Sequence, residues 1–111
     1  MITKTKTVLA KLLPSAKPLS QQDVVLAREY IAGYWAKLER HHPKDDDSLV
    51  GLPHPYLVPA YEAHHEFDFN EMYYWDSYFM GLGLVGTEHE SVIIDMAENM
   101  AYLFNRFGII P

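Results

Sequence analysis

Cysteine is absent from this sequence of 111 residues. Disulfide bonds, thiolate catalysis and zinc sites built on cysteine are therefore excluded. The sequence also lacks a run of about 18 apolar residues, so no transmembrane helix and no membrane partner are expected. Positive charge is scarce, because 9 Lys and Arg stand against 15 Asp and Glu, for a net charge of −6. Since binding to phosphates needs a clustered basic face, no nucleic-acid partner is expected.

The composition that remains is typical of a folded protein rather than a disordered one, with 49% apolar and 22% charged residues. The length fits one small domain. The N-terminus has a basic start and a short apolar stretch, but Lys11 interrupts that stretch and no small-x-small cleavage site follows. We therefore expect a cytoplasmic protein, and a secretory signal peptide is the less favoured alternative.

The first expected element is an amphipathic helix from about Gln21 to His42. Ser20 and Asp23 have the spacing of a capping box, in which each side chain bonds to the backbone of the other residue. Leu19 is placed to pack on Val24 as a hydrophobic staple. Apolar residues then recur at helical spacing: Val24, Ala27, Ile31, Tyr34 or Trp35, and Leu38. Pro43 prevents the helix from continuing.

Residues 43–72 show no helical or strand period, and four prolines interrupt them. A loop of about thirty residues is unusual in a small domain and indicates a functional segment or part of a larger assembly. Its apolar residues predict that it packs on the protein: Leu49, Val50, Leu52, Tyr56, Leu57, Val58, Tyr61, Phe67 and Phe69.

A helical hairpin is expected after the loop. Asp76 or Ser77 is placed to cap a helix that runs to about Val85, and Gly86 ends it. Thr87 and Glu90 form a second expected capping box. The helix that follows has a wide apolar stripe and a glycine C-cap, with these members: Val92, Ile93, Met96, Asn99, Met100, Leu103, Phe104, Phe107 and Gly108.

The predicted fold class is all-α with one long ordered loop. Three helices and an aromatic loop do not easily cover one another's apolar faces, and Ile109 and Ile110 add an apolar end. We therefore expect residues 1–111 to be the first portion of an incomplete helical domain. The stripe of Val92, Met96, Leu103 and Phe107 is then expected to be exposed and to drive self-association.

The densest candidate for chemistry is the run from Phe69 to Phe79, in which six of eleven residues are aromatic. Aromatic faces stack on sugar rings, and the carboxylates of Glu71 and Asp76 accept hydrogen bonds from sugar hydroxyls. The run therefore suits a carbohydrate subsite. The alternative is a core-forming stretch in which Asp76 only caps a helix, because aromatic runs are usually core.

Two histidine clusters were weighed as metal sites, and neither has a zincin spacing. They are His64, His65, Glu66 and Asp68, and the pair His41 and His42 beside Asp45–Asp47. Gly81, Gly83 and Gly86 fit no nucleotide fingerprint, and small residues at close helix contacts explain Gly81 and Gly83 better. We expect neither a metal nor a cofactor.

The run from Phe69 to Phe79 resembles the first signature of the trehalase family of glycoside hydrolases. In that signature a Gly-Gly-Arg-Phe turn and a short acidic spacer precede an aromatic-Trp-Asp-Ser-Tyr-Phe helix start. Residues 55–59 resemble the family's Pro-rich approach to the turn, and residues 106–111 resemble its Arg-aromatic-Gly-x-Ile-Pro stretch. The resemblance covers about residues 53–111, and the helix expected at 21–42 fits the family's preceding helix.

The resemblance implies that Phe69, Trp75 and Asp76 contact the sugar. It departs from the family at Asp68, which stands where the family has its sugar-binding Arg. A carboxylate does not supply a guanidinium fork. The substrate preference therefore differs, or a neighbouring residue substitutes, or the chain has a non-hydrolytic role.

The resemblance further implies an (α/α) toroid of helical hairpins that hydrolyses trehalose, or a related α-glucoside, with inversion. Inversion needs an acid and a base about 6.5–9.5 Å apart, and in the family both lie downstream of the part that this chain matches. No catalytic residue is therefore assigned within residues 1–111. The alternatives are a non-catalytic sugar-binding or helical interaction fragment, and a structural fragment without activity.

Overall fold

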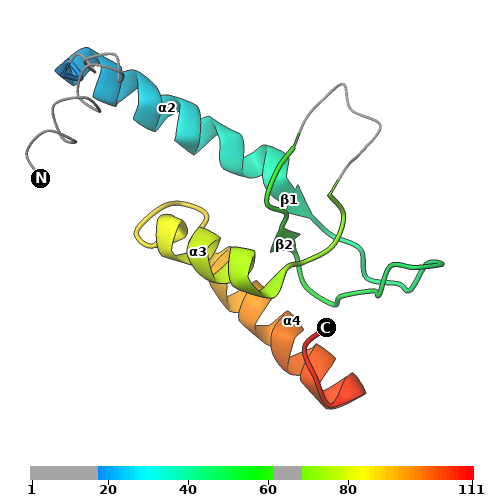
Figure 1. The fold of residues 1–111 in the computed structure, drawn as a ribbon. Helices are drawn as coiled ribbons and strands as arrows, with labels where there is room; N and C mark the ends of the chain where they lie inside the picture. Colours follow the sequence, from blue (N-terminus) through cyan, green and yellow to red (C-terminus); the bar gives the residue numbers. More distant parts are fainter. Residues whose placement is uncertain (1–17, 62–68) are drawn as a thin grey trace, which may run out of the picture. The chain divides into compact units, whose positions relative to one another are not determined.

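The computed structural model of the protein describes residues 18–61 and 69–111. The chain divides into two compact units, residues 1–31 and 32–111. The described part has three helices, α2 (Gln21–Leu38), α3 (Tyr74–Leu84) and α4 (Ser91–Phe107), and a small antiparallel ladder of β1 (Glu39–Arg40) and β2 (Tyr56–Leu57) (Figure 1). The all-α prediction is confirmed, and the two-residue strands are an addition to it.

In the first unit, the capping box at the start of α2 is confirmed. The Ser20 hydroxyl accepts a hydrogen bond from the Asp23 N–H at 3.1 Å, and the Asp23 carboxylate accepts one from the Ser20 N–H at 2.9 Å. The Ser20 hydroxyl also donates a hydrogen bond to the Asp23 carboxylate, and this bond lowers the pKa of Asp23. The expected staple is not formed, because Leu19 is 77% exposed.

Helix α2 ends at Leu38 rather than at His42. Glu39 and Arg40 leave the helix to pair with Leu57 and Tyr56 of β2, and the Leu38 carbonyl accepts a hydrogen bond from the Val58 N–H at 2.9 Å. The backbone bonds to β2 replace those that a longer helix would form. Pro43 therefore does not set the end of the helix.

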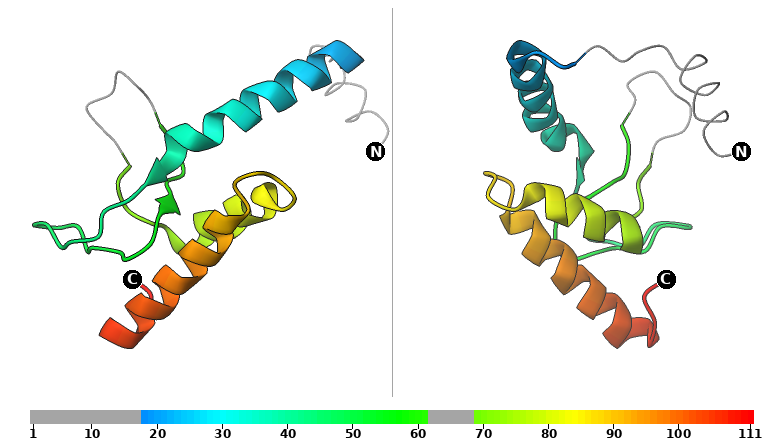
Figure 2. Two further views of the ribbon diagram at one scale, coloured as in Figure 1. Left: turned by 180° about the vertical axis from the view of Figure 1, so that it is seen from behind. Right: turned by 60° about the vertical axis from the view of Figure 1, so that its left-hand side comes forward.

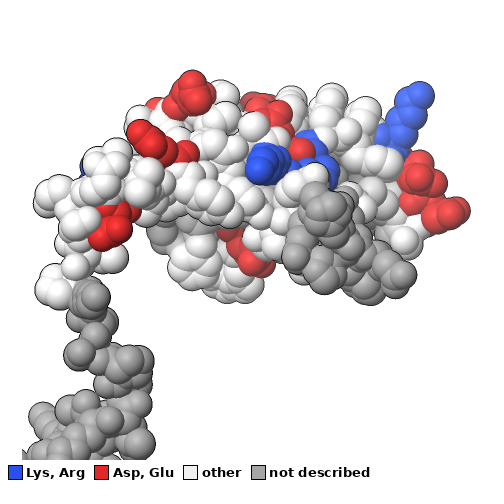
Figure 3. All heavy atoms as spheres, turned by 90° about the horizontal axis from the view of Figure 1, so that it is seen from above, with Lys and Arg blue, Asp and Glu red and all other residues white. Residues whose placement is uncertain are grey.

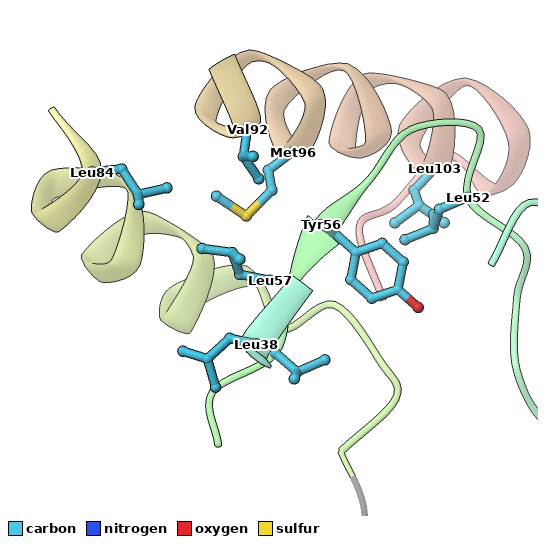
Figure 4. Packing of buried hydrophobic residues seen from close by; sticks show 9 residues of the cluster. Leu38, Leu52, Tyr56, Leu57, Leu84, Val92, Met96 and Leu103 are labelled. Atoms are coloured by element: carbon cyan, nitrogen blue, oxygen red, sulfur yellow. The ribbon is translucent and has the colours of Figure 1, made fainter. Parts of the chain in front are cut away.

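The Pro-containing loop supplies much of the core of the second unit, as its apolar content predicts. Leu52, Tyr56, Leu57 and Val58 are all buried. In Figure 4 the side chains of β2 point toward those of α3 and α4. Of the other loop residues expected to pack, Phe67 lies outside the described residues and Phe69 is 39% exposed.

Helices α3 and α4 form the expected hairpin and lie side by side in Figures 1 and 2. The turn contains Gly86 at a φ of 76°, which ends α3 as predicted. Thr87 does not cap α4 with Glu90. Its hydroxyl instead donates to the Leu84 carbonyl at 2.7 Å and accepts from the His89 N–H at 3.2 Å. Thr87 therefore closes the end of α3.

The predicted caps of α3 are also wrong. The N-cap position is Tyr73, which makes no side-chain cap bond. Asp76 lies in the first turn of the helix and Ser77 is buried inside it. The aromatic run continues directly from the loop into the helix, so the helix begins at Tyr74, three residues earlier than a cap at Asp76 requires.

Helix α4 carries the predicted stripe, but the stripe is not exposed. Val92, Met96, Asn99 and Leu103 are buried against the loop and α3. Phe107 is 46% exposed at the end of the helix, where Gly108 forms the predicted left-handed cap. The small residues of α3 permit close packing, since a Cβ at Gly83 would lie 3.3 Å from the Trp35 ring.

Most of the exposed apolar surface lies away from the expected stripe, of which Val92, Met96 and Leu103 are buried and Phe107 is exposed. On α3 it consists of Tyr74, Trp75, Tyr78, Phe79 and Leu82, and on α4 of Ile94, Phe104 and Phe107. None of the helices within the described ranges is long and apolar enough to span a lipid bilayer. On the face that Figure 3 shows, the described Lys and Arg side chains form no continuous basic surface.

Candidate functional site

The predicted sugar contacts lie where the loop enters α3. Phe69 packs edge-on against the Tyr73 ring, with ring centroids 5.9 Å apart. Trp75 packs against Tyr74 at 5.2 Å and is 68% exposed. Asp76 is exposed in the first turn of α3. The start of α3 thus presents accessible ring faces and an accessible carboxylate.

Tyr73 links the two carboxylates of this segment. Its hydroxyl donates a hydrogen bond to Glu71 Oε2 at 3.1 Å. Burial raises the pKa of Tyr73, and the negative charges of Glu71 and Asp76 raise it further. Both carboxylates therefore raise the pKa of the same phenol, and Glu71 is hydrogen-bonded to it. Together with the Phe69 ring they combine an apolar face with hydrogen-bond acceptors.

A cavity of about 270 Å³ adjoins this segment. Glu71 and Tyr73 line one side of it, and Leu52, Tyr56 and Leu103 line the other. The Tyr56 hydroxyl donates to the Asn70 carbonyl at 2.6 Å, which ties the buried strand β2 to the residue next to Phe69. The volume is close to the lower end of the range for small-molecule sites.

Trp75 lines a different hollow, a groove of about 460 Å³ between α3 and α4. The groove is almost wholly apolar, with Tyr74, Tyr78 and Leu82 on α3 and Ile93 and Met100 on α4. Successive helical residues point about 100° apart. For this reason Trp75 and Asp76 do not share one cavity, and the structure does not bring all three predicted contacts together.

Asn99 has a structural role that the sequence pattern does not reveal, because it occupies a position of the apolar stripe of α4. It is completely buried. Its side-chain oxygen accepts a hydrogen bond from the His54 N–H at 3.0 Å, and its Nδ2 donates to the His54 carbonyl at 2.9 Å. Asn99 therefore holds the Pro-rich segment before β2. A lone amide at the centre of an apolar stripe was the available signal.

A second missed contact joins residues that are 61 positions apart. The Arg106 guanidinium donates two hydrogen bonds to the Asp45 carboxylate, at 2.9 and 2.5 Å. The Gly51 N–H donates to Asp45 as well, at 2.8 Å. The Arg106 bonds, helped by that of Gly51, hold the pKa of Asp45 well below its usual range. The ion pair thus fixes the loop on the last turn of α4.

One of the two candidate histidine clusters lies outside the part of the chain that the structure describes. His64, His65, Glu66 and Asp68 lie outside the described residues, so the Asp68 departure is not placed either. His41 Nε2 lies 3.3 Å from the Pro53 carbonyl oxygen. Within residues 18–61 and 69–111, the group that does converge is His54, Asp95 and Glu98, which no local motif indicates.

Comparison with known proteins gives consistent results. The Trehalase family model matches residues 5–111. A periplasmic trehalase of Xanthomonas axonopodis pv. citri is 44% identical over 93 residues, which are 82% of this chain and 15% of the relative. A periplasmic trehalase of Shigella flexneri serotype 5b is 43% identical over 86 residues, which are 76% of this chain and 14% of the relative. The chain therefore spans about 15% of the length of these relatives.

The relatives also correct the expected location. They are named periplasmic trehalases, so the expectation of a cytoplasmic protein is wrong. That expectation rested on the lack of a cleavage motif near Lys11, which is a feature of the N-terminal segment alone. The folded part of the chain carried no information on location.

Proposed function

Because the chain belongs to the trehalase family, we propose that the complete protein is a periplasmic glycoside hydrolase that converts trehalose, or a related α-glucoside, to glucose with inversion. The observation that carries the proposal is the family match over residues 5–111. Residues 1–111 are then the N-terminal portion of one (α/α)-toroid domain. The chain spans about 15% of the length of the first relative, which supports its assignment to a portion of a larger domain.

In this proposal the start of α3 forms part of the sugar-binding wall. The accessible rings of Phe69 and Trp75 stack on the apolar faces of the sugar. The Asp76 carboxylate accepts hydrogen bonds from sugar hydroxyls. Support comes from the exposure of all three side chains and from the hydrogen bond that holds Glu71 beside Tyr73.

The acid and base that perform hydrolysis are proposed to lie elsewhere in the complete protein. Glu71 accepts a hydrogen bond from Tyr73. Asp76 lies exposed in the first turn of α3. An ionised carboxylate is a poor general acid at neutral pH. We therefore expect no hydrolysis of trehalose by residues 1–111 alone.

The groove between α3 and α4 is proposed to be covered by following helices of the same toroid. Its lining is apolar, and Trp75, Tyr78 and Leu82 are each more than half exposed. An apolar surface of this kind marks an interaction site rather than a solvated face. In the complete domain, Trp75 then lies where the groove covered by the following helices meets the sugar-binding wall.

The stereochemistry of the products tests the proposed activity. Inversion at one anomeric carbon of trehalose yields β-glucose, while the leaving glucose keeps its α configuration. We expect ¹H NMR of a fresh reaction of the complete protein to show equal amounts of the two anomers before mutarotation. Release of α-glucose alone would contradict inversion, and no release would contradict hydrolysis.

A non-catalytic sugar-binding fragment is the second candidate, and Asp68 in place of the family's Arg favours it. Calorimetric titration of the complete protein with trehalose separates the two. Saturable binding without glucose release would support the second candidate and overturn the first.

A further inference from the structure

Three potential metal-ligating side chains converge on the solvent side of α4. His54 comes from the Pro-rich segment before β2, and Asp95 and Glu98 come from one face of α4. His54 Nδ1 lies 3.8 Å from Asp95 Oδ1, and His54 Nε2 lies 3.1 Å from Glu98 Oε2. One ligand atom from each residue can be chosen so that all three lie within 4.8 Å of one another.

The chemistry of this set suits a divalent transition metal. Imidazole nitrogen and carboxylate oxygen bind zinc at about 2.0–2.2 Å, and ligand atoms of a tetrahedral site are then about 3.3–3.5 Å apart. The two distances from His54 start at different ring nitrogens. Only one of these nitrogens binds the ion, so the carboxylate on the other side of the ring has to turn toward it. The three side chains are 39%, 30% and 56% exposed, so water can complete the coordination.

The backbone that carries these ligands is already held in place. Asp95, Glu98 and Asn99 are positions i, i+3 and i+4 of α4 and lie on one face. Asn99 bonds to both the N–H and the carbonyl of His54. A buried contact therefore holds the backbone of His54 beside the carboxylates of α4. Ligands that are positioned in advance bind with less loss of conformational entropy.

We propose that His54, Asp95 and Glu98 bind one divalent transition-metal ion, with Zn²⁺ as the probe, and that the ion fastens the Pro-rich segment to α4. The proposal does not depend on the proposed activity, because these residues are not among the predicted sugar contacts. The competing explanation is a protonated His54 paired with two carboxylates and no metal.

The chain contains a matched control for that explanation. His89 Nε2 lies 3.6 Å from Glu88 Oε1, and among the described residues this histidine–carboxylate pair belongs to no group of three possible ligands. If any histidine–carboxylate pair bound the metal, substitution of His54 and substitution of His89 would both weaken metal binding. If binding needs three ligands, only substitutions of His54, Asp95 or Glu98 would weaken it.

Equilibrium dialysis of the 111-residue chain against Zn²⁺ tests the proposal. We expect about one ion per chain, and at least tenfold weaker binding in His54→Gln and in Glu98→Gln. We expect His89→Gln, and the double variant His64→Gln/His65→Gln, to bind as the original chain does. Co²⁺ gives a second readout, since its visible absorption intensifies when a nitrogen–oxygen site of low coordination number forms.

Thermal unfolding measurements show whether each variant is folded. Zn²⁺ should raise the melting temperature of the original chain and of His89→Gln, because a ligand of the folded state stabilises it. It should not raise that of Glu98→Gln, whose change lies on an exposed side chain. Absence of saturable Zn²⁺ binding, or binding that survives both His54→Gln and Glu98→Gln, would overturn the proposal.

Discussion

Asp76 offers a direct test of the proposed sugar wall in the complete protein. Hydrogen bonds to an ionised acceptor contribute about 1.5–3 kcal/mol each. Since about 1.4 kcal/mol corresponds to a factor of ten, Asp76→Ala should lower kcat/KM for trehalose by roughly two decades. Steady-state kinetics measures this loss.

Asp76→Asn separates sugar binding from helix stabilisation. The amide keeps the shape of the carboxylate but loses its charge. A large loss of affinity at nearly constant melting temperature supports the sugar contact. A fall in stability with affinity unchanged would assign Asp76 to the helix start alone. Glu88→Gln, at an exposed residue of the α3–α4 turn, is the control and should change neither quantity.

The ion pair of Asp45 and Arg106 predicts a pH dependence of stability. The folded state lowers the pKa of Asp45, so the stabilisation by the pair is complete above the unfolded pKa of about 3.9 and is lost only as the pH falls through the much lower folded pKa. The melting temperature of the original chain should exceed that of Asp45→Asn at about pH 6, and the difference should begin to narrow below about pH 4 without closing at about pH 3.

A neighbouring acid supplies the comparison for this experiment. Asp47→Asn also removes a carboxylate from the acidic run, two positions from Asp45. It should not reproduce the pH-dependent difference. An equal effect of both substitutions would mean that general charge in the loop, rather than the Arg106 bond, stabilises it.

Among the helices, two glycines should respond in opposite ways to the same substitution. Gly108 ends α4 at a φ of 76°, and its N–H donates to the Phe104 carbonyl at 2.7 Å. A Cβ in this left-handed conformation costs about 1–2 kcal/mol. Gly33 lies inside α2 with nothing near its Cβ position, and alanine there should stabilise by about 0.5–1 kcal/mol.

Urea unfolding of the two variants measures the contrast. Gly108→Ala should lower the free energy of unfolding, and Gly33→Ala should raise it. A destabilised Gly33→Ala would show that α2 is not a regular helix at this position. An unchanged Gly108→Ala would show that the end of α4 is not fixed by its cap.

For the whole chain we predict self-association of residues 1–111. Val92, Met96 and Leu103 are buried and so cannot form the contact between chains. The expected contact face is therefore the exposed apolar groove between α3 and α4. Sedimentation should show species larger than a monomer. Leu82→Gln, which lies in the groove, should shift the population toward the monomer. Ile94→Gln should not, since Ile94 is similarly exposed, at 62% against 59%, and does not line the groove.

A monodisperse monomer that melts cooperatively would contradict this prediction. It would also weaken the proposal that further helices cover the groove. The activity proposal would be unaffected, because the anomer experiment concerns the complete protein.

Local patterns in the sequence were sufficient to place the three helices, but not all of their ends. The capping box of Ser20 and Asp23, the apolar residues of the α4 stripe and the cap at Gly108 were predicted, because each depends on residues within a few positions of one another. The expected exposure of the stripe was wrong, because the loop covers it. The apolar residues of the loop likewise predicted that it packs. The aromatic run indicated the family, since its order of residues is specific.

Contacts between distant parts of the chain could not be read from such patterns. Helix α2 ends at Leu38 because β2 pairs with the next two residues, and Asn99 holds His54 across 45 positions. Asp45 meets Arg106, and His54 meets Asp95 and Glu98, only when the loop folds over α4. Each of these contacts satisfies a buried polar group or a charge, and their partners are chosen by proximity in space rather than by spacing along the chain.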